Sequence, residues 1–95
     1  MDKKIYLITI IENIGDNETA VTHEGVVIGD EAKAAEAQKK AFDDCLSFWM
    51  TEWEEDTLED VFEIYKRKNK LIAISKNEFE IDCKIECFIE GVNEI

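Results

Sequence analysis

The strictest pattern in this chain is an alternation of apolar and polar side chains over residues 79–90. The odd-numbered positions hold only Phe, Ile and Cys, and every even-numbered position except Phe88 is charged. Successive side chains of a β-strand point to opposite faces. The pattern therefore predicts a long strand with one apolar face, and another layer of the protein must cover that face.

Four further segments have the composition and spacing of β-strands. They are residues 4–12, 19–28, 61–66 and 71–75. The first is apolar on both faces, which predicts a strand in the interior of the sheet, and Gly25 in the second is typical of a β-bulge. Residues 57–66 also fit a helical stripe, so a helix is the alternative there, although we favour a strand from about residue 61.

One long helix is predicted over residues 31–54, with Asp30 as its N-cap. A mostly apolar stripe recurs along it at three- and four-residue spacing, formed by Ala35, Gln38, Phe42, Cys45, Leu46, Trp49 and Trp53. Phe48 and Met50 lie off this stripe, so we expect both to be exposed. The predicted order is ββαβββ: a single α+β domain over residues 1–95, with an antiparallel sheet of about five strands and the helix packed across one face.

The net charge of −12 is concentrated in one quarter of the chain. Residues 41–65 contain nine acids and no base, whereas residues 66–70 contain four bases. Like charges at this density repel one another, a cost in stability that interleaved lysines would avoid. We therefore interpret the acidic segment, with its two off-stripe apolar residues, as a surface that binds a partner protein. The candidate residues are Asp43, Asp44, Phe48, Met50, Glu52, Glu54, Glu55, Asp56, Glu59, Asp60 and Glu63.

Several function classes are disfavoured by the composition. A pI near 4.4 opposes direct binding of nucleic acid or of an anionic membrane, and no apolar run approaches the roughly 20 residues of a membrane span. His23 is the only histidine, and no catalytic triad, phosphate loop, zinc set or calcium loop is recognisable. We expect a protein that is not an enzyme and takes no metal or cofactor. Its three cysteines are expected to be reduced thiols in the cytoplasm.

These features predict a small acidic inhibitor that binds a basic, nucleic-acid-handling protein in place of nucleic acid. Carboxylates three or four residues apart on a helix stand about 5–6 Å apart, which lets them occupy several phosphate-binding positions. In size and charge the chain resembles the acidic single-domain inhibitors that phages and mobile elements use against restriction and CRISPR nucleases. The alternative is a regulatory or assembly module, homodimeric through an open sheet edge such as the strand at 79–89.

Overall fold

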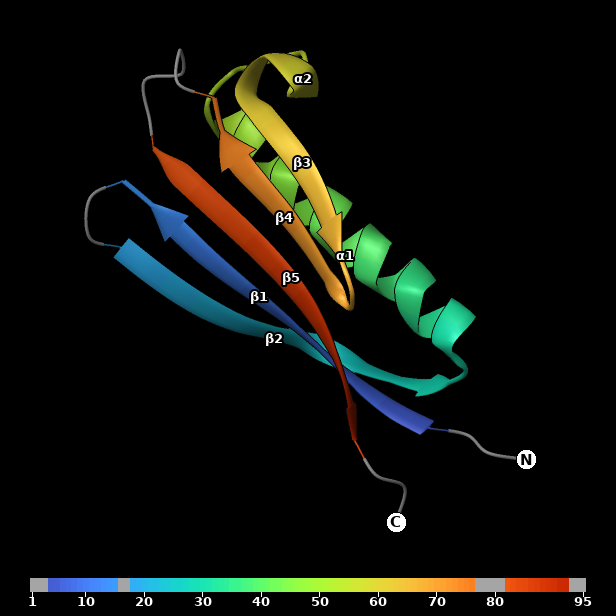
Figure 1. The fold of residues 1–95 in the computed structure, drawn as a ribbon. Coiled ribbons are helices and arrows are strands. Elements are labelled where there is room, and N and C mark those ends of the chain that lie inside the picture. The colour runs from blue at the N-terminus through green and yellow to red at the C-terminus, as the bar shows by residue number, and fades with distance from the viewer. Residues whose placement is uncertain (1–3, 16–17, 77–81, 93–95) are drawn as a thin grey trace.

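The computed structural model describes residues 4–15, 18–76 and 82–92, and these ranges form five strands and two helices (Figure 1). In chain order they are β1 Lys4–Ile14, β2 Glu18–Gly29, α1 Glu31–Glu52, α2 Leu58–Val61, β3 Phe62–Arg67, β4 Lys70–Ser75 and β5 Cys83–Val92. The predicted α+β class and ββαβββ order are confirmed, with α2 as one added helical turn. Residues 79–81, where the last strand was predicted to begin, and the side chain of His23 lie outside the described part.

The five strands form one antiparallel sheet in the order β2-β1-β5-β4-β3. β1 lies between β2 and β5, so the prediction of an interior position for the first strand is confirmed. β5 lies between β1 and β4, so the expectation that this strand offers a free edge is wrong. An interior position pairs the backbone groups on both sides of the strand, which an edge position would leave to solvent. The edges of the sheet are β2 and β3.

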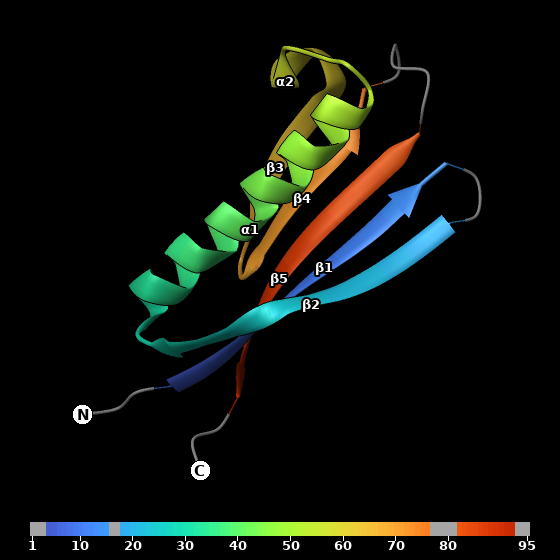
Figure 2. The same ribbon diagram turned by 180° about the vertical axis from the view of Figure 1, so that it is seen from behind.

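α1 packs across one face of the sheet, and the core lies between these two layers (Figure 2). Ile8 and Ile10 of β1 are buried there, together with Cys83, Ile85 and Cys87 of β5. The apolar face predicted for the last strand is therefore confirmed over the described residues. Removing this apolar surface from water, at about 25 cal/mol per Å², is the main term that holds the helix on the sheet. No helix in the described ranges is both long and apolar enough to cross a membrane.

The most buried residues of the helix recur at every fourth position, and Cys45, Trp49 and Trp53 of the predicted stripe pack beside them, partly buried against the core. The buried residues of α1 are Ala34, Gln38, Phe42, Leu46 and Met50. Ala35 is exposed, and the prediction that Met50 is exposed is wrong. Trp49 of the predicted stripe packs partly buried against the core, and its indole N–H donates to the carboxylate of Glu12 at the flank of the helix. The flexible methionine fills the centre instead.

Two local predictions are confirmed by the backbone. The Asp30 carboxylate accepts a hydrogen bond of 2.9 Å from the backbone N–H of Lys33, as an N-cap residue does. The β1–β2 register shifts between Ile8 and Thr9, opposite Gly25, whose φ of +151° lies outside the range comfortable for other residues. The extra residue of this bulge increases the local twist of the β1–β2 ribbon.

Both alternatives for residues 57–66 are realised in part. Residues 58–61 make one helical turn, and the strand begins at Phe62. Val61 and Phe62 are both buried, so the last residue of the turn and the first of the strand anchor the segment in the core. This anchoring brings α2 against the end of α1 (Figure 1).

The side of the sheet opposite α1, here called the open face, is not covered by any other described element (Figures 1 and 2). Val21, Val26 and Ile28 of β2 are each more than half exposed on it. They belong to the register that also places Ile5, Leu7 and Ile11 of β1 on this face. The structure therefore combines one buried apolar face with a second, partly apolar face in contact with solvent.

Candidate functional site

The site begins where α1 stops. The backbone N–H of Glu55 donates to the carbonyl of Met50 (2.9 Å), and that of Glu54 donates to the carbonyl of Thr51 (3.1 Å). These two bonds form a Schellman motif, whose left-handed residue is usually glycine. Here it is Glu54, with φ of +56°. A side chain in this conformation costs about 1 kcal/mol, so a carboxylate stands where glycine is the stable choice.

Six exposed carboxylates surround this helix end, and we call them the acidic end: Glu52, Glu54, Glu55, Asp56, Glu59 and Asp60. Within the described part of the chain none of the six forms an ion pair. α1 has no basic residue in its last turn, although the negative end of a helix dipole favours a cation there by roughly 0.3–1 kcal/mol. Four of the six, residues 52–56, are therefore placed against the dipole and are left available to an external cation.

A row of stacked aromatic rings connects the acidic end to the core. The ring centroids of Trp49 and Trp53 are 5.4 Å apart, and those of Trp53 and Phe62 are 6.0 Å apart. Both distances lie in the favourable range for aromatic pairs. Because Trp49 is also hydrogen-bonded to Glu12 of β1, the helix end is held at several points. The carboxylates are thus presented on a fixed support.

Phe48 is the exposed apolar member of this surface, and its predicted exposure is confirmed. It is 55% exposed and packs edge-to-face on Trp49 with a centroid distance of 5.2 Å. Asp44 and Glu52, four residues before and after it, lie on the same side of the helix. The arrangement is an aromatic side chain between two carboxylates.

Two of the predicted acidic residues are already paired. Asp43 and Asp44 accept from Lys39 and Lys40 at 2.7 and 2.8 Å, in exposed pairs four residues apart along α1. The bond to Asp44 raises the pKa of Lys40 above its ordinary value. Exposed pairs of this kind contribute little to stability. They nevertheless leave Asp43 and Asp44 less available than the acidic end.

Glu63 and Met50 are separated from the other predicted residues. Glu63 lies opposite Ile74 in the β3–β4 register, on the open face, and accepts from the hydroxyl of Tyr65 at 2.8 Å. That hydrogen bond raises the pKa of Tyr65. Met50 is buried under α1. Phe48 and the acidic end are therefore exposed on the last turns of α1 and the segment that follows it, and these two residues lie elsewhere.

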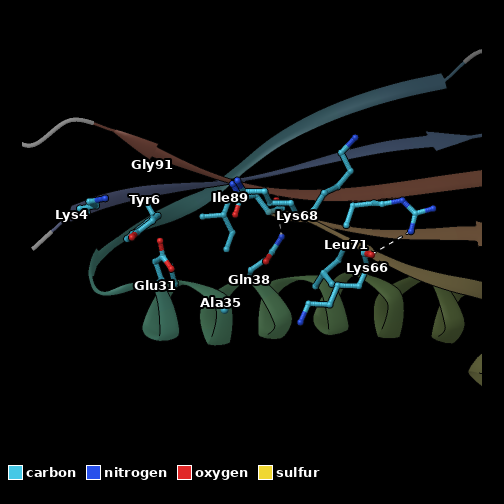
Figure 3. Close-up of a pocket in the computed structure, with 14 residues that line it drawn as sticks. Lys4, Tyr6, Glu31, Ala35, Gln38, Lys66, Lys68, Leu71, Ile89 and Gly91 are labelled. Atoms are coloured by element: carbon cyan, nitrogen blue, oxygen red, sulfur yellow. Dashed lines mark hydrogen bonds between the residues drawn. The ribbon is translucent and has the colours of Figure 1, made fainter.

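A second site was missed by the sequence reasoning. A cavity of about 710 Å³ lies between the first half of α1 and the sheet, and residues 66–70 form one of its walls (Figure 3). The run of four bases in that segment was visible in the sequence. The proximity of this segment to Lys4, Tyr6 and Glu31 was not visible. Lys4 and Tyr6 reach it through the β1–β5–β4 pairing, and Glu31 reaches it because α1 packs on the sheet.

In the described ranges no group of three or more His, Cys, Asp and Glu residues is arranged to hold a metal ion. The three cysteines are free thiols, with Cys83 and Cys87 buried and Cys45 half-buried. Comparison of the chain with protein-family models, with curated proteins and with solved structures finds no match.

Proposed function

We propose that this protein is a non-enzymatic inhibitor that binds a basic, nucleic-acid-handling protein through Phe48 and the acidic end. The observation that carries the proposal is the set of six exposed carboxylates without an ion pair among the described residues. A target of this kind, such as a restriction or CRISPR nuclease, carries Lys- and Arg-lined grooves for phosphates. We also propose that the inhibitor acts in the cytoplasm, which is supported by its three free cysteines.

The loss of stability that the fold accepts at this helix end supports the proposal. At one helix end the chain combines a left-handed Glu54, several carboxylates against the helix dipole, and a high density of like charge. A domain that needed charge only for solubility could distribute its acids over the surface, where they would lower the free energy of unfolding less. Residues held against local preference are a recognised mark of functional surfaces. The stacked rings beneath add rigidity, so little entropy is lost when this surface docks.

The test is a competition experiment with two charge-matched variants. The tagged protein is used to capture nucleic-acid-binding proteins from a nuclease-treated extract, and bound material is challenged with duplex DNA and with rising salt. The first variant reverses three carboxylates of the acidic end to lysine, Glu54, Glu55 and Asp56. The second reverses three exposed carboxylates elsewhere, Glu36, Asp82 and Glu90.

We expect the captured protein to be displaced by DNA and by moderate salt, and to be lost with the first variant but not with the second. Both variants change the net charge equally, so a loss with both would indicate general electrostatic attraction rather than this surface. Retention by the first variant, with its fold shown intact by circular dichroism, would refute the proposed site.

A second candidate function is assembly, in which the open face binds a second copy of the chain. The described charges on this face are balanced: Lys70, Lys84 and Arg67 against Glu63, Glu86 and Glu90. Glu86 pairs within the face, 3.0 Å from Lys70 and 3.8 Å from Lys84. Copies of a chain with a net charge of −12 repel each other on most sides. A face of zero net charge avoids that repulsion.

The area of the open face is also adequate for a dimer. Five strands about 4.8 Å apart, with a mean length of roughly 30 Å, give a face of about 700 Å², close to the roughly 800 Å² per partner of a stable interface. Sedimentation equilibrium should then show twice the chain mass of 11.0 kDa. Val26→Glu with Ile28→Glu should give the monomer, and Ile64→Glu, exposed but on the helix side of β3, should not. A monomer for the unmodified chain excludes this function.

A further inference from the structure

The cavity beside the first half of α1 has the size of a small-molecule site and an unusual charge for this chain. Its volume of about 710 Å³ lies within the range of roughly 300–1,000 Å³ typical of ligand pockets. Five basic side chains line it, against one acidic residue, Glu31. The whole protein has 23 acids and 11 bases. Nearly half of its bases therefore gather at one cavity, which is lined by the first half of α1, whereas the acidic end lies at the other end of that helix.

The turn that carries most of these bases is fixed in place. The carbonyl of Asn69 accepts from the backbone N–H of Ile89 at 2.9 Å and from Nε2 of Gln38 at 3.3 Å. The same Nε2 donates to the carbonyl of Cys87 at 2.8 Å, and Gln38 is the only polar residue buried in the described part of the chain. This buried amide ties the β3–β4 turn to both α1 and β5. The bases beside the turn are thus preorganised for binding.

Two of the five bases have other interactions, and three do not. The Arg67 guanidinium lies over the Tyr65 ring, and the Lys70 ammonium pairs with Glu86, both on the open face. Lys66 lies instead on the helix side of β3, opposite Leu71 in the register. Lys4, Lys66 and Lys68 form no ion pair with any described residue. In so acidic a chain, three such cations around one cavity point to an anionic ligand.

The other end of the cavity is polar and carries both signs of charge, from Lys4 and Glu31, beside Tyr6 (Figure 3). Tyr6 is only 8% exposed, and its hydroxyl forms no hydrogen bond with a described residue. Since no buried side-chain oxygen in the described part of the chain lacks a partner, this hydroxyl is the solvent-accessible end of the side chain. The Glu31 carboxylate faces it from the first turn of α1 (Figure 3). A carboxylate and a free phenol together bind ligand hydroxyl groups, because one accepts and the other donates or accepts. Glu31 lies seven residues before Gln38, about 10 Å along the helix, so one ligand can reach both ends.

The geometry points to a binding site for a small phosphorylated compound of the sugar phosphate or mononucleotide class. Lys66 and Lys68 would hold the phosphate at the β3–β4 turn, whereas Lys4 lies at the far end, beside Tyr6 (Figure 3). Glu31 and Tyr6 would hold sugar hydroxyl groups at the far end, over an apolar floor that includes Leu71 and Ile89. The site shares no residue with the acidic end, so it is independent of the proposed inhibitor function.

The experiment titrates the full chain with ribose 5-phosphate, AMP and inorganic phosphate, followed by amide NMR shifts and calorimetry. We expect ribose 5-phosphate or AMP to bind with a Kd of about 1 mM or below, with shifts confined to the cavity, including the amides of Gln38 and Asn69. Replacing Lys66 and Lys68 by glutamine should weaken binding about tenfold. The matched pair Lys39→Gln with Lys40→Gln removes the same charge from exposed positions outside the cavity and should leave the Kd unchanged.

A third variant tests the hydroxyl end. Glu31→Gln should weaken ribose 5-phosphate and leave inorganic phosphate unaffected, because only the sugar reaches that residue. Three results would overturn the proposal: no shifts in the cavity at about 10 mM ligand, equal loss with the two lysine pairs, or tighter binding of triglutamate, which has negative charge but no phosphate. Spectra of the free variants establish that each is folded.

Discussion

Reversing one charge at the acidic end should make the protein more stable while weakening its binding. Glu52 is the last residue of α1, exposed and without an ion pair in the described chain. Glu52→Lys places a cation at the negative end of the helix dipole. Glu31→Lys makes the same change in the first turn, where the acid is favourable. Each variant has a net charge of −10, two units above −12, so overall repulsion is the same in both.

The magnitude follows from the dipole alone. A charge in the first or last turn is worth roughly 0.3–1 kcal/mol, and the two variants change stability in opposite directions. Each reversal replaces a charge by its opposite and so changes stability by about twice that amount, which makes the difference in unfolding free energy between the two variants about 1–4 kcal/mol. Each kcal/mol corresponds to about 4–8 °C in Tm for a domain of this size. Thermal unfolding followed by circular dichroism at low salt measures it. The difference should shrink at high salt, because exposed charges are screened.

The reasoning is refuted if Glu52→Lys is no more stable than Glu31→Lys at low salt. It is also refuted if Glu52→Lys gains stability but captures the basic partner as well as the unmodified chain does. Higher stability combined with weaker binding is the outcome that assigns this helix end to function rather than to the fold.

Three further perturbations test the fold around the site. Glu54→Gly should raise the unfolding free energy by up to about 1 kcal/mol in urea titrations, since it removes the strain of the left-handed residue; a loss of stability would contradict the Schellman assignment. Leu46→Ala should lower the unfolding free energy by about 2–5 kcal/mol, because Leu46 is 2% exposed in the core, and a change below about 1 kcal/mol would show that this contact is not formed. Burial raises the pKa of the Cys83 thiol from 9.0 to about 11, so its contribution to stability is fully present below pH 9 and is lost as the pH rises through 11. Cys83→Ala should flatten this part of the pH–stability curve, and an unchanged slope would exclude the thiol as its source.

Local patterns accounted for most of the elements. The period-two pattern of the last strand, the apolar first strand, the Asp30 cap and the Gly25 bulge depend on residues within a few positions of one another. These features could therefore be predicted from the sequence without the tertiary structure. The helix position was also predicted, and most of its predicted stripe packs against the core. Met50 is buried where exposure was predicted, and Trp49 is only partly buried while its indole N–H donates to an acceptor on β1.

The acidic end was predicted in part. Clustering of acids near residue 52 is a property of the sequence, and so is the exposed Phe48. The left-handed conformation of Glu54 and the separation of Glu63 onto the open face depend on where α1 stops and on which side of β3 each residue lies. These features needed the three-dimensional arrangement.

By itself the sequence determined the element order, the amphipathic faces and the uneven charge, because each arises from spacing and composition along the chain. Only the tertiary structure decided that β5 enters between β1 and β4, pairing residues near the two ends of the chain. That pairing brings Lys4 and Tyr6 toward the turn at residues 66–70, and the packing of α1 on one face adds Glu31 and leaves the open face uncovered. The physical reason is that strand order depends on the backbone pairing and apolar burial of the whole sheet. A short segment of sequence does not contain enough information to predict that sum.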